Sequence, residues 1–244
     1  MKSSITALVG IIALAAIVAG HFFGLGYSVG VGIALSVVFG LGWPRYLGIP
    51  AKKTLGTVMA LTGAGAALTV GLTKDANFMV WTPIFIAVGF GAVMVVQLIR
   101  GTGQAHRLES TLGSGAGVLV AGFASGWVAS QRFLGEPGMT LIVAISAAVA
   151  LLAGTLPWPD RVAAPLAIVL GALSGPLAAL LFSDLRIVPA VILGALVAAV
   201  IASFRRLRTL AGPSHSFMGS CASALAPILS LGALVYFVEK LLLS

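Results

Sequence analysis

Charge is the component this sequence lacks most. Only 8% of its 244 residues are charged, and six of them are acidic, whereas about a quarter of the residues in an average soluble domain carry a charge. So few charges cannot cover the surface of a water-soluble fold, and the mean hydropathy is +1.13. Lipid must therefore cover much of the surface, which predicts an integral membrane protein.

Cysteine is almost absent as well. The single Cys221 excludes an intramolecular disulfide and a cysteine-rich metal site, and it says little about the cellular compartment. The net charge is +8, which in a soluble protein would raise the question of nucleic acid. Here the basic residues lie in short connections between apolar runs. We therefore expect no nucleic-acid partner, and membrane lipids with anionic head groups on the inner leaflet instead.

Long apolar runs fill most of the chain, and each approaches the ~20 residues that a helix needs to cross a bilayer. The nine predicted spans are Ile5–Phe23, Leu25–Trp43, Thr54–Thr73, Phe78–Ile99, Leu112–Ser130, Met139–Leu156, Val162–Phe182, Ile187–Phe204 and Ser216–Val238. The first run has no convincing signal-peptidase motif after it, so we expect it to stay as a span. The predicted fold is all-α, one bundle of about nine transmembrane helices forming a single domain over residues 1–244. Only His21 and Gly24 separate the first two spans, which makes that division the least secure.

The connections differ in basic charge. Those on the side of the N-terminus carry ten Lys and Arg residues, and those on the opposite side carry four. The positive-inside rule then predicts a plasma-membrane protein with its N-terminus in the cytoplasm and its C-terminus outside.

Small residues recur four positions apart within the spans. The pairs are Gly26/Gly30, Gly113/Gly117, Gly122/Gly126 and Gly171/Gly175. Such pairs let helix backbones approach closely in a membrane. We interpret them as packing faces, which also allows a homo-oligomer or a membrane-protein partner; a substrate groove is the minority interpretation.

Acidic residues are confined to connections and span ends. A charge kept within the bilayer is costly and is usually functional, so this distribution argues against a transporter built around an intramembrane carboxylate. It also provides no cluster of oxygen ligands for a divalent metal, and we predict no metal site and no cofactor. Ser214, His215 and Ser216 lack a nearby acid to complete a catalytic triad. We interpret this segment as a polar turn in which Ser214 or Ser216 caps the last helix.

Three segments, Gln97–Gly103, Gly194–Val200 and Pro213-Ser214-His215, suggest a family. Through them the region from about Val80 to the C-terminus resembles phosphatidate cytidylyltransferase, the CDP-diacylglycerol synthase, in its actinobacterial form. Gln97–Gly103 is similar to the arginine- and glycine-containing loop of that family, and Gly194–Val200 is similar to its penultimate helix. Arg205-Arg206 lies near the Lys-Arg position of the family signature, and Pro213-Ser214-His215 matches its Pro-Gly-His.

The resemblance fails where the family binds metal. Ser220 and Ser223 stand at the two metal-binding aspartate positions, and Ala147–Gly175 has no counterpart of the family's central aspartate or its Ser-Pro-Lys-Lys-Ser-Trp-Glu-Gly loop. A serine cannot supply the charge of a carboxylate ligand to Mg²⁺. The resemblance therefore implies a synthase-like scaffold in a lipid environment and argues against catalysis.

Three arginines close to the end of the eighth span form the candidate site. Arg205, Arg206 and Arg208 can reach head-group phosphates, which arginine grips with two hydrogen bonds, and we place His215 and Ser216 at the edge of this site. Alternatively, the arginines only fix topology. The favoured function is a non-catalytic membrane protein that binds anionic phospholipid or a membrane partner at its cytoplasmic face. A small-solute permease or channel and a divergent nucleotidyl or phosphoryl transferase acting on lipid are the alternatives.

Overall fold

The computed structural model describes residues 2–74, 77–101, 107–135, 137–156, 158–182, 187–212 and 216–243. These residues form ten α-helices, and the part of the chain that the structure describes contains no strand. The helices are α1 Lys2–Phe23, α2 Leu25–Tyr46, α3 Lys52–Leu72, α4 Thr82–Ile99, α5 Arg107–Phe123, α6 Ser125–Leu134, α7 Gly138–Ala153, α8 Asp160–Phe182, α9 Ile187–Ala211 and α10 Phe217–Leu243. The predicted all-α fold is confirmed.

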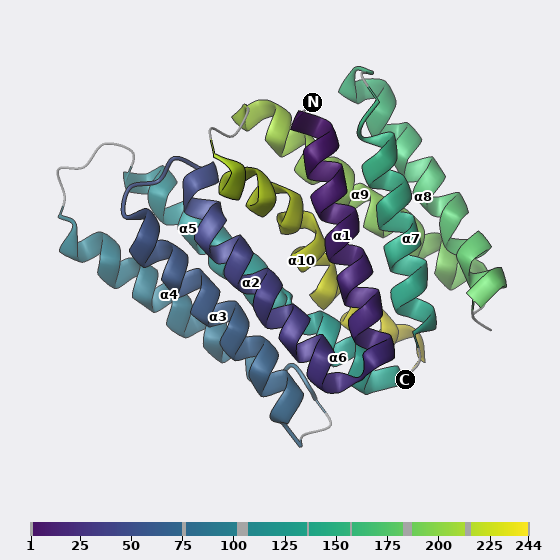
Figure 1. Cartoon of the computed structure of the whole chain (residues 1–244), viewed down its shortest axis with the longest axis horizontal. Helices are drawn as coiled ribbons and strands as arrows, with labels where there is room; N and C mark the ends of the chain where they lie inside the picture. The colour runs from purple at the N-terminus through teal and green to yellow at the C-terminus, as the bar shows by residue number, and fades with distance from the viewer. Residues whose placement is uncertain are drawn as a thin grey trace.

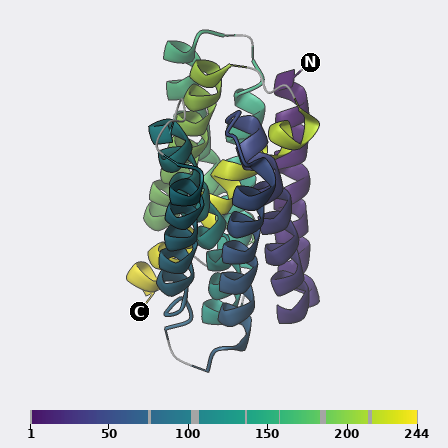
Figure 2. The ribbon, with the colours of Figure 1, turned by 90° about the vertical axis from the view of Figure 1, so that its left-hand side faces the viewer.

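The helices run up and down in one bundle (Figures 1 and 2). Eight helical segments of the described chain are long and apolar enough to cross a membrane, and one of them joins α5 and α6 over Arg107–Phe133. The apolar helix α7 is shorter, but it runs alongside α1 and α8 (Figure 1). With α7 counted, the bundle makes nine passes, and the two termini lie at its opposite ends (Figures 1 and 2).

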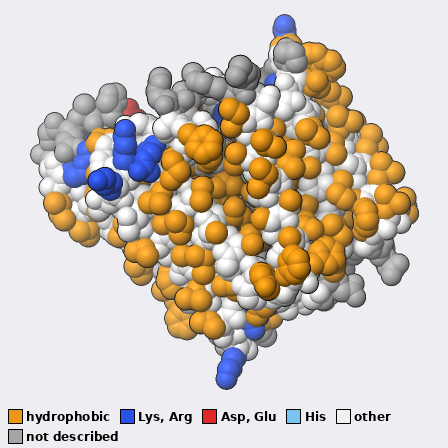
Figure 3. Space-filling model, in the orientation of Figure 1, with side chains coloured by type: hydrophobic (Ala, Val, Ile, Leu, Met, Phe, Trp, Pro, Cys, Tyr) orange, Lys and Arg blue, Asp and Glu red, His pale blue; other side chains and the backbone are white. Residues whose placement is uncertain are grey.

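A broad hydrophobic face covers the middle of the molecule (Figure 3). Large apolar side chains are exposed on the outer helices, among them Leu61 of α3, Val88 of α4 and Leu180 of α8, each about two-thirds exposed. Basic side chains lie mainly at the end of the bundle that holds the N-terminus, with fewer at the other end (Figure 3). Such a surface suits a hydrocarbon layer between two polar interfaces.

Two helix boundaries have a local cause. Gly24 has φ +103°, a backbone conformation that other residues rarely adopt, and it turns the chain directly from α1 into α2. This confirms the division of the first two spans. The fifth span is interrupted at Ala124, where the Ser125 hydroxyl donates a hydrogen bond to the Gly122 carbonyl at 2.8 Å and contacts the Thr82 hydroxyl at 3.0 Å. Bonds from a serine to its own helix favour such bends.

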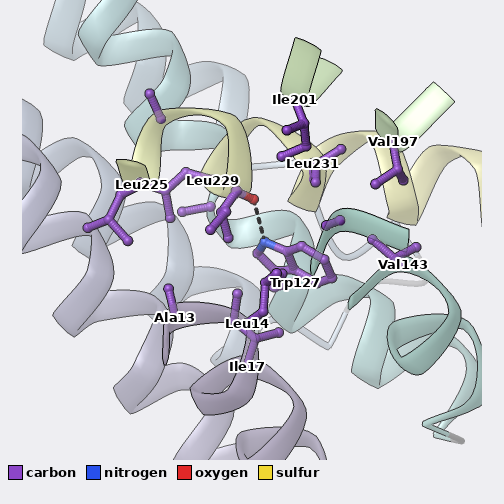
Figure 4. Close-up of a cluster of buried hydrophobic side chains, with 14 of the residues drawn as sticks. Ala13, Leu14, Ile17, Trp127, Val143, Val197, Ile201, Leu225, Leu229 and Leu231 are labelled. Carbon is purple, nitrogen blue, oxygen red and sulfur yellow. Dashed lines mark hydrogen bonds between the residues drawn. The ribbon is translucent and has the colours of Figure 1, made fainter. Parts of the chain in front are cut away.

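Helix α10 lies at the centre of the bundle and packs against α1, α2, α5, α6, α7 and α9. Trp127 of α6 anchors it, because the indole nitrogen donates a 2.9 Å hydrogen bond to the carbonyl of Ile228 (Figure 4). Leu225, Leu229 and Leu231 of α10 surround this contact in the buried core (Figure 4). A buried tryptophan that has found an acceptor combines a large apolar contact with a satisfied polar group.

Three of the four glycine pairs lie against neighbouring helices, as predicted for packing faces, although the nearest atoms to Gly113 and Gly117 belong to side chains and not to a backbone. A Cβ on Gly126 would lie 2.2 Å from the backbone of Gly232, one on Gly175 would lie 2.3 Å from that of Ala190, and one on Gly117 would lie 2.5 Å from the Trp43 ring. The prediction is wrong for Gly26 and Gly30, since no described atom lies within 4 Å of a Cβ at either position. These two glycines face outward from α2.

Candidate functional site

The predicted arginines lie on the last two turns of α9, which continues through Ala211 instead of ending at Phe204 as expected. Because successive residues of an α-helix are rotated by about 100°, the three side chains point in different directions. Arg205 reaches toward the end of α7, where its Nη2 donates to the Trp158 carbonyl at 3.3 Å and to the Leu156 carbonyl at 3.5 Å. Both carbonyls belong to the connection between α7 and α8, so Arg205 ties the end of α9 to that connection.

Arg205 and Arg206 border a groove between α8 and α9 with a volume of about 550 Å³. Arg161, in the first turn of α8, lines the same groove. The other lining residues are small or apolar, apart from one serine: Ala164, Pro165, Ile168, Ala199, Ala202 and Ser203. The structure therefore brings three guanidinium groups to the end of an otherwise largely apolar groove.

The groove follows from how α8 and α9 cross. Gly171 and Gly194 bring the two backbones together, since a Cβ on Gly194 would lie 2.2 Å from the Gly171 carbonyl oxygen. Every groove residue lies on the arginine side of this contact. Pro165 lies in the same stretch of α8 and cannot donate the helical hydrogen bond to the Arg161 carbonyl. Two helices that touch at one crossing diverge beyond it, and small residues leave the space between them open.

Arg208 does not line this groove. It is partly buried and lies close enough to Tyr46 of α2 for an electrostatic interaction. Neither its buried Nη1 nor the buried Tyr46 hydroxyl has a hydrogen-bond partner among the described residues. The three arginines predicted to form one site are therefore divided between two surroundings.

The remaining predicted site residues are in the connection to α10. His215 lies outside the described residues. Ser216 accepts a 3.0 Å hydrogen bond from the Gly219 amide through its Oγ, which confirms its predicted role as the N-cap of the last helix. Ser220 and Ser223 donate to carbonyls of their own chain, those of Ser216 and Ser220, at 3.3 and 2.9 Å. Ser220 and Ser223 thus both bond to carbonyls near the start of α10.

Two residues at these sites were missed by sequence reasoning. The sequence places Arg161 only among the ten basic residues on the side of the N-terminus, and nothing in its local sequence predicts that it lies beside α9. Glu239 was assigned to a span end, but its side chain is only 1% exposed. Glu239 does lie near a span end, as predicted, but the sequence does not predict its burial; α10 runs to Leu243, five residues beyond the predicted end of the span, and Glu239 bonds to Ser130 of α6. The apolar residues on both sides of Glu239, in VYFVEKLLL, were the available signal.

The described side chains contain no group of three His, Cys, Asp or Glu residues that could hold a metal ion. His21, Thr140 and Gln131 instead form a buried polar contact at the end of the bundle opposite the arginines. The His21 ring lies 3.2 Å from the Thr140 hydroxyl, and the Gln131 amide donates to the His21 carbonyl at 3.1 Å. No family model, curated protein or solved structure matches the chain.

Proposed function

We propose that this chain is a non-catalytic integral membrane protein that binds an anionic phospholipid in the groove between α8 and α9. The observation that carries the proposal is the joint position of Arg161, Arg205 and Arg206 at one groove of about 550 Å³. The arginines take the head-group phosphate, and the Ala- and Pro-lined part takes the start of an acyl chain. An amphiphile with a negative head is the ligand class that this combination suits.

The location of the groove supports a lipid rather than a soluble ligand. Helices α8 and α9 form one side of the bundle (Figure 1), and Val162 and Val169, at the two ends of the α8 stretch that lines the groove, are about half exposed. A lipid can therefore enter from the hydrocarbon layer without displacing a helix. Guanidinium groups at the polar end of a span also reach phosphate oxygens with little loss of hydration.

We further propose that the arginine-rich end faces the cytoplasm, where the inner leaflet supplies anionic lipid. The scaffold is proposed to be synthase-like, and the serines at the family's metal positions support binding without transfer chemistry. Arg205 has a structural role as well, because it bonds to carbonyls after α7. Arg161 and Arg206 are thus the better residues to test.

The test is retention of phosphatidylglycerol by the purified protein in native mass spectrometry. Each basic residue near an anionic surface is worth about 1 kcal/mol, so Arg161→Gln with Arg206→Gln should weaken retention by roughly thirtyfold. The matched control is Lys52→Gln with Lys53→Gln, which removes the same charge from exposed positions at the start of α3. The control protein should retain the lipid as the wild type does.

A second variant separates the groove from general attraction of charge. Ala199→Phe fills the groove without changing charge and should also reduce retention. If the arginine pair and the lysine pair weaken retention equally, or if Ala199→Phe has no effect, the lipid is held by the surface charge and the groove proposal is refuted.

A further inference from the structure

Glu239 is the buried ionisable group that the proposed function does not use. It lies on α10 near the end opposite the arginines and is 1% exposed. Its Oε1 accepts a 2.7 Å hydrogen bond from the hydroxyl of Ser130, which is also 1% exposed. Its Oε2 is buried and has no hydrogen-bond partner among the residues described.

The basic groups nearby in the chain are engaged elsewhere. Arg132, two residues after Ser130, donates to the carbonyls of Val70 and Thr73, each at 2.6 Å, and its guanidinium carbon lies 4.5 Å from the centre of the Phe78 ring. Lys240, next to Glu239, donates to the side chain of Asn77. Both cations thus bind the connection between α3 and α4. Among the described residues, the Glu239 carboxyl group has the Ser130 hydroxyl as its hydrogen-bond partner.

Two other titratable side chains at this end of the described chain have contacts of their own. Tyr236, one turn before Glu239, bonds to the backbone of Phe78, and His21 contacts Thr140. A buried carboxylate with no cation is among the costliest groups in a protein interior, and it is expected to be neutralised. The simplest neutralising ligand is a proton, because it needs no coordination sphere and fits on the unbonded oxygen.

We propose that Glu239 is a proton-binding site of the bundle: in the packed state it holds a proton, and it releases this proton to water only when the end of α10 separates from α6. The end of the helix is close, since α10 stops at Leu243, four residues after Glu239. The two helices are joined nearby by the Ser130–Glu239 bond and by the Gly126–Gly232 contact. Release of the proton would leave a negative charge on Glu239, which would draw water between α6 and α10.

Infrared spectroscopy of the purified full-length protein in detergent tests the proposal directly. A protonated carboxyl group gives a carbonyl stretch that an ionised one lacks. At neutral pH the wild type should show this band, and Glu239→Gln should lose it. The matched control is Glu109→Gln, which changes an exposed acid at the other end of the bundle and should leave the band in place. Ser130→Ala keeps the carboxyl group but removes its donor, so it should shift the band, which identifies it even if Glu239→Gln does not fold.

Stability gives an independent readout. A glutamate in an unfolded chain releases its proton near pH ~4.3, whereas the packed state retains it. The native state then binds more protons than the unfolded state, so stability should fall as pH rises above that value, by up to tenfold in the unfolding equilibrium constant per pH unit. Glu239→Gln should remove this component of the slope, and Glu109→Gln should not.

Two results would overturn the proposal. One is the absence of any difference in the carbonyl band between wild type and Glu239→Gln at neutral pH. The other is stabilisation of the wild type, but not of Glu239→Gln, by sodium relative to choline at equal ionic strength, which would assign the site to a metal cation instead.

Discussion

The contact between α6 and α10 gives the sharpest prediction about stability. Gly126 and Gly232 face each other across it, and a Cβ on Gly126 would lie 2.2 Å from the carbonyl carbon of Gly232 and 2.3 Å from the Ala233 nitrogen. These are backbone atoms and cannot rotate away as a side chain would. To reach an ordinary contact distance, the two helices must separate by roughly 1 Å, which forfeits a quarter to a half of the dispersion energy at each atom pair.

The loss of stability caused by Gly126→Ala can be estimated from the overpacking and from the hydrogen bonds that the separation of the helices weakens. Overpacking in a well-packed core costs about 1–3 kcal/mol. The bond from the Trp127 indole to Ile228 and the bond from Ser130 to Glu239 join the same two helices, and weakening them adds about 1 kcal/mol. We expect Gly126→Ala to lower the free energy of unfolding by about 2–4 kcal/mol.

The assay is reversible unfolding of the detergent-solubilised protein with increasing sodium dodecyl sulfate, followed by circular dichroism. Gly30→Ala is the matched control, because it makes the same change within α2 where no described atom lies within 4 Å of the new Cβ. The control should be neutral or stabilised by about 0.5–1 kcal/mol, since alanine favours the helix. If the two variants are equally stable, the close contact between α6 and α10 does not exist and the reasoning fails.

Two further predictions concern the membrane. In a Cys221→Ser background, single cysteines replacing Thr54 and Lys240 should react with a membrane-impermeant reagent from opposite sides of the membrane, Thr54 from the cytoplasmic side. The reason is that α3 begins and α10 ends at opposite ends of the bundle. Reaction of both cysteines from one side would exclude this topology. Purified protein supplied with CTP, phosphatidic acid and Mg²⁺ should form no CDP-diacylglycerol, and product formation that His215→Ala abolishes would show that the chain is an active transferase.

The spans could be predicted because hydropathy acts residue by residue. A helix that crosses hydrocarbon must keep its backbone bonded internally and its surface apolar, so each span reads as a continuous apolar run. The predicted start of α2 at Leu25 and of α9 at Ile187 agree with the structure. Helix ends were less predictable, because a polar residue does not stop a helix: α9 continues through its arginines to Ala211.

The sites could be predicted only in part, because they depend on pairs of helices. Arg205 and Arg206 were found as a local charge cluster, but Arg161 joins them through the crossing at Gly171 and Gly194, which local sequence does not encode. Glu239 looks like a residue at the water interface, and its burial depends on how α10 packs in the bundle, where Ser130 of α6 bonds to it. Composition therefore identifies the environment of the chain, whereas the angles between helices decide which polar groups meet.

The two proposed sites should behave independently. The groove uses the ends of α8 and α9 beside Arg161 and Arg206, and the carboxyl site uses the ends of α6 and α10 at Ser130 and Glu239. Helix α10 alone has 27 residues, which at 1.5 Å per residue is about 40 Å, so the sites are much farther apart than the ~10 Å within which substitutions usually couple. Removing the arginines should therefore leave the carbonyl band of Glu239 unchanged. A change in that band would require a structural element that has two alternative arrangements and contacts both sites. Helix α10 is positioned to be this element, because it packs against both α6 and α9.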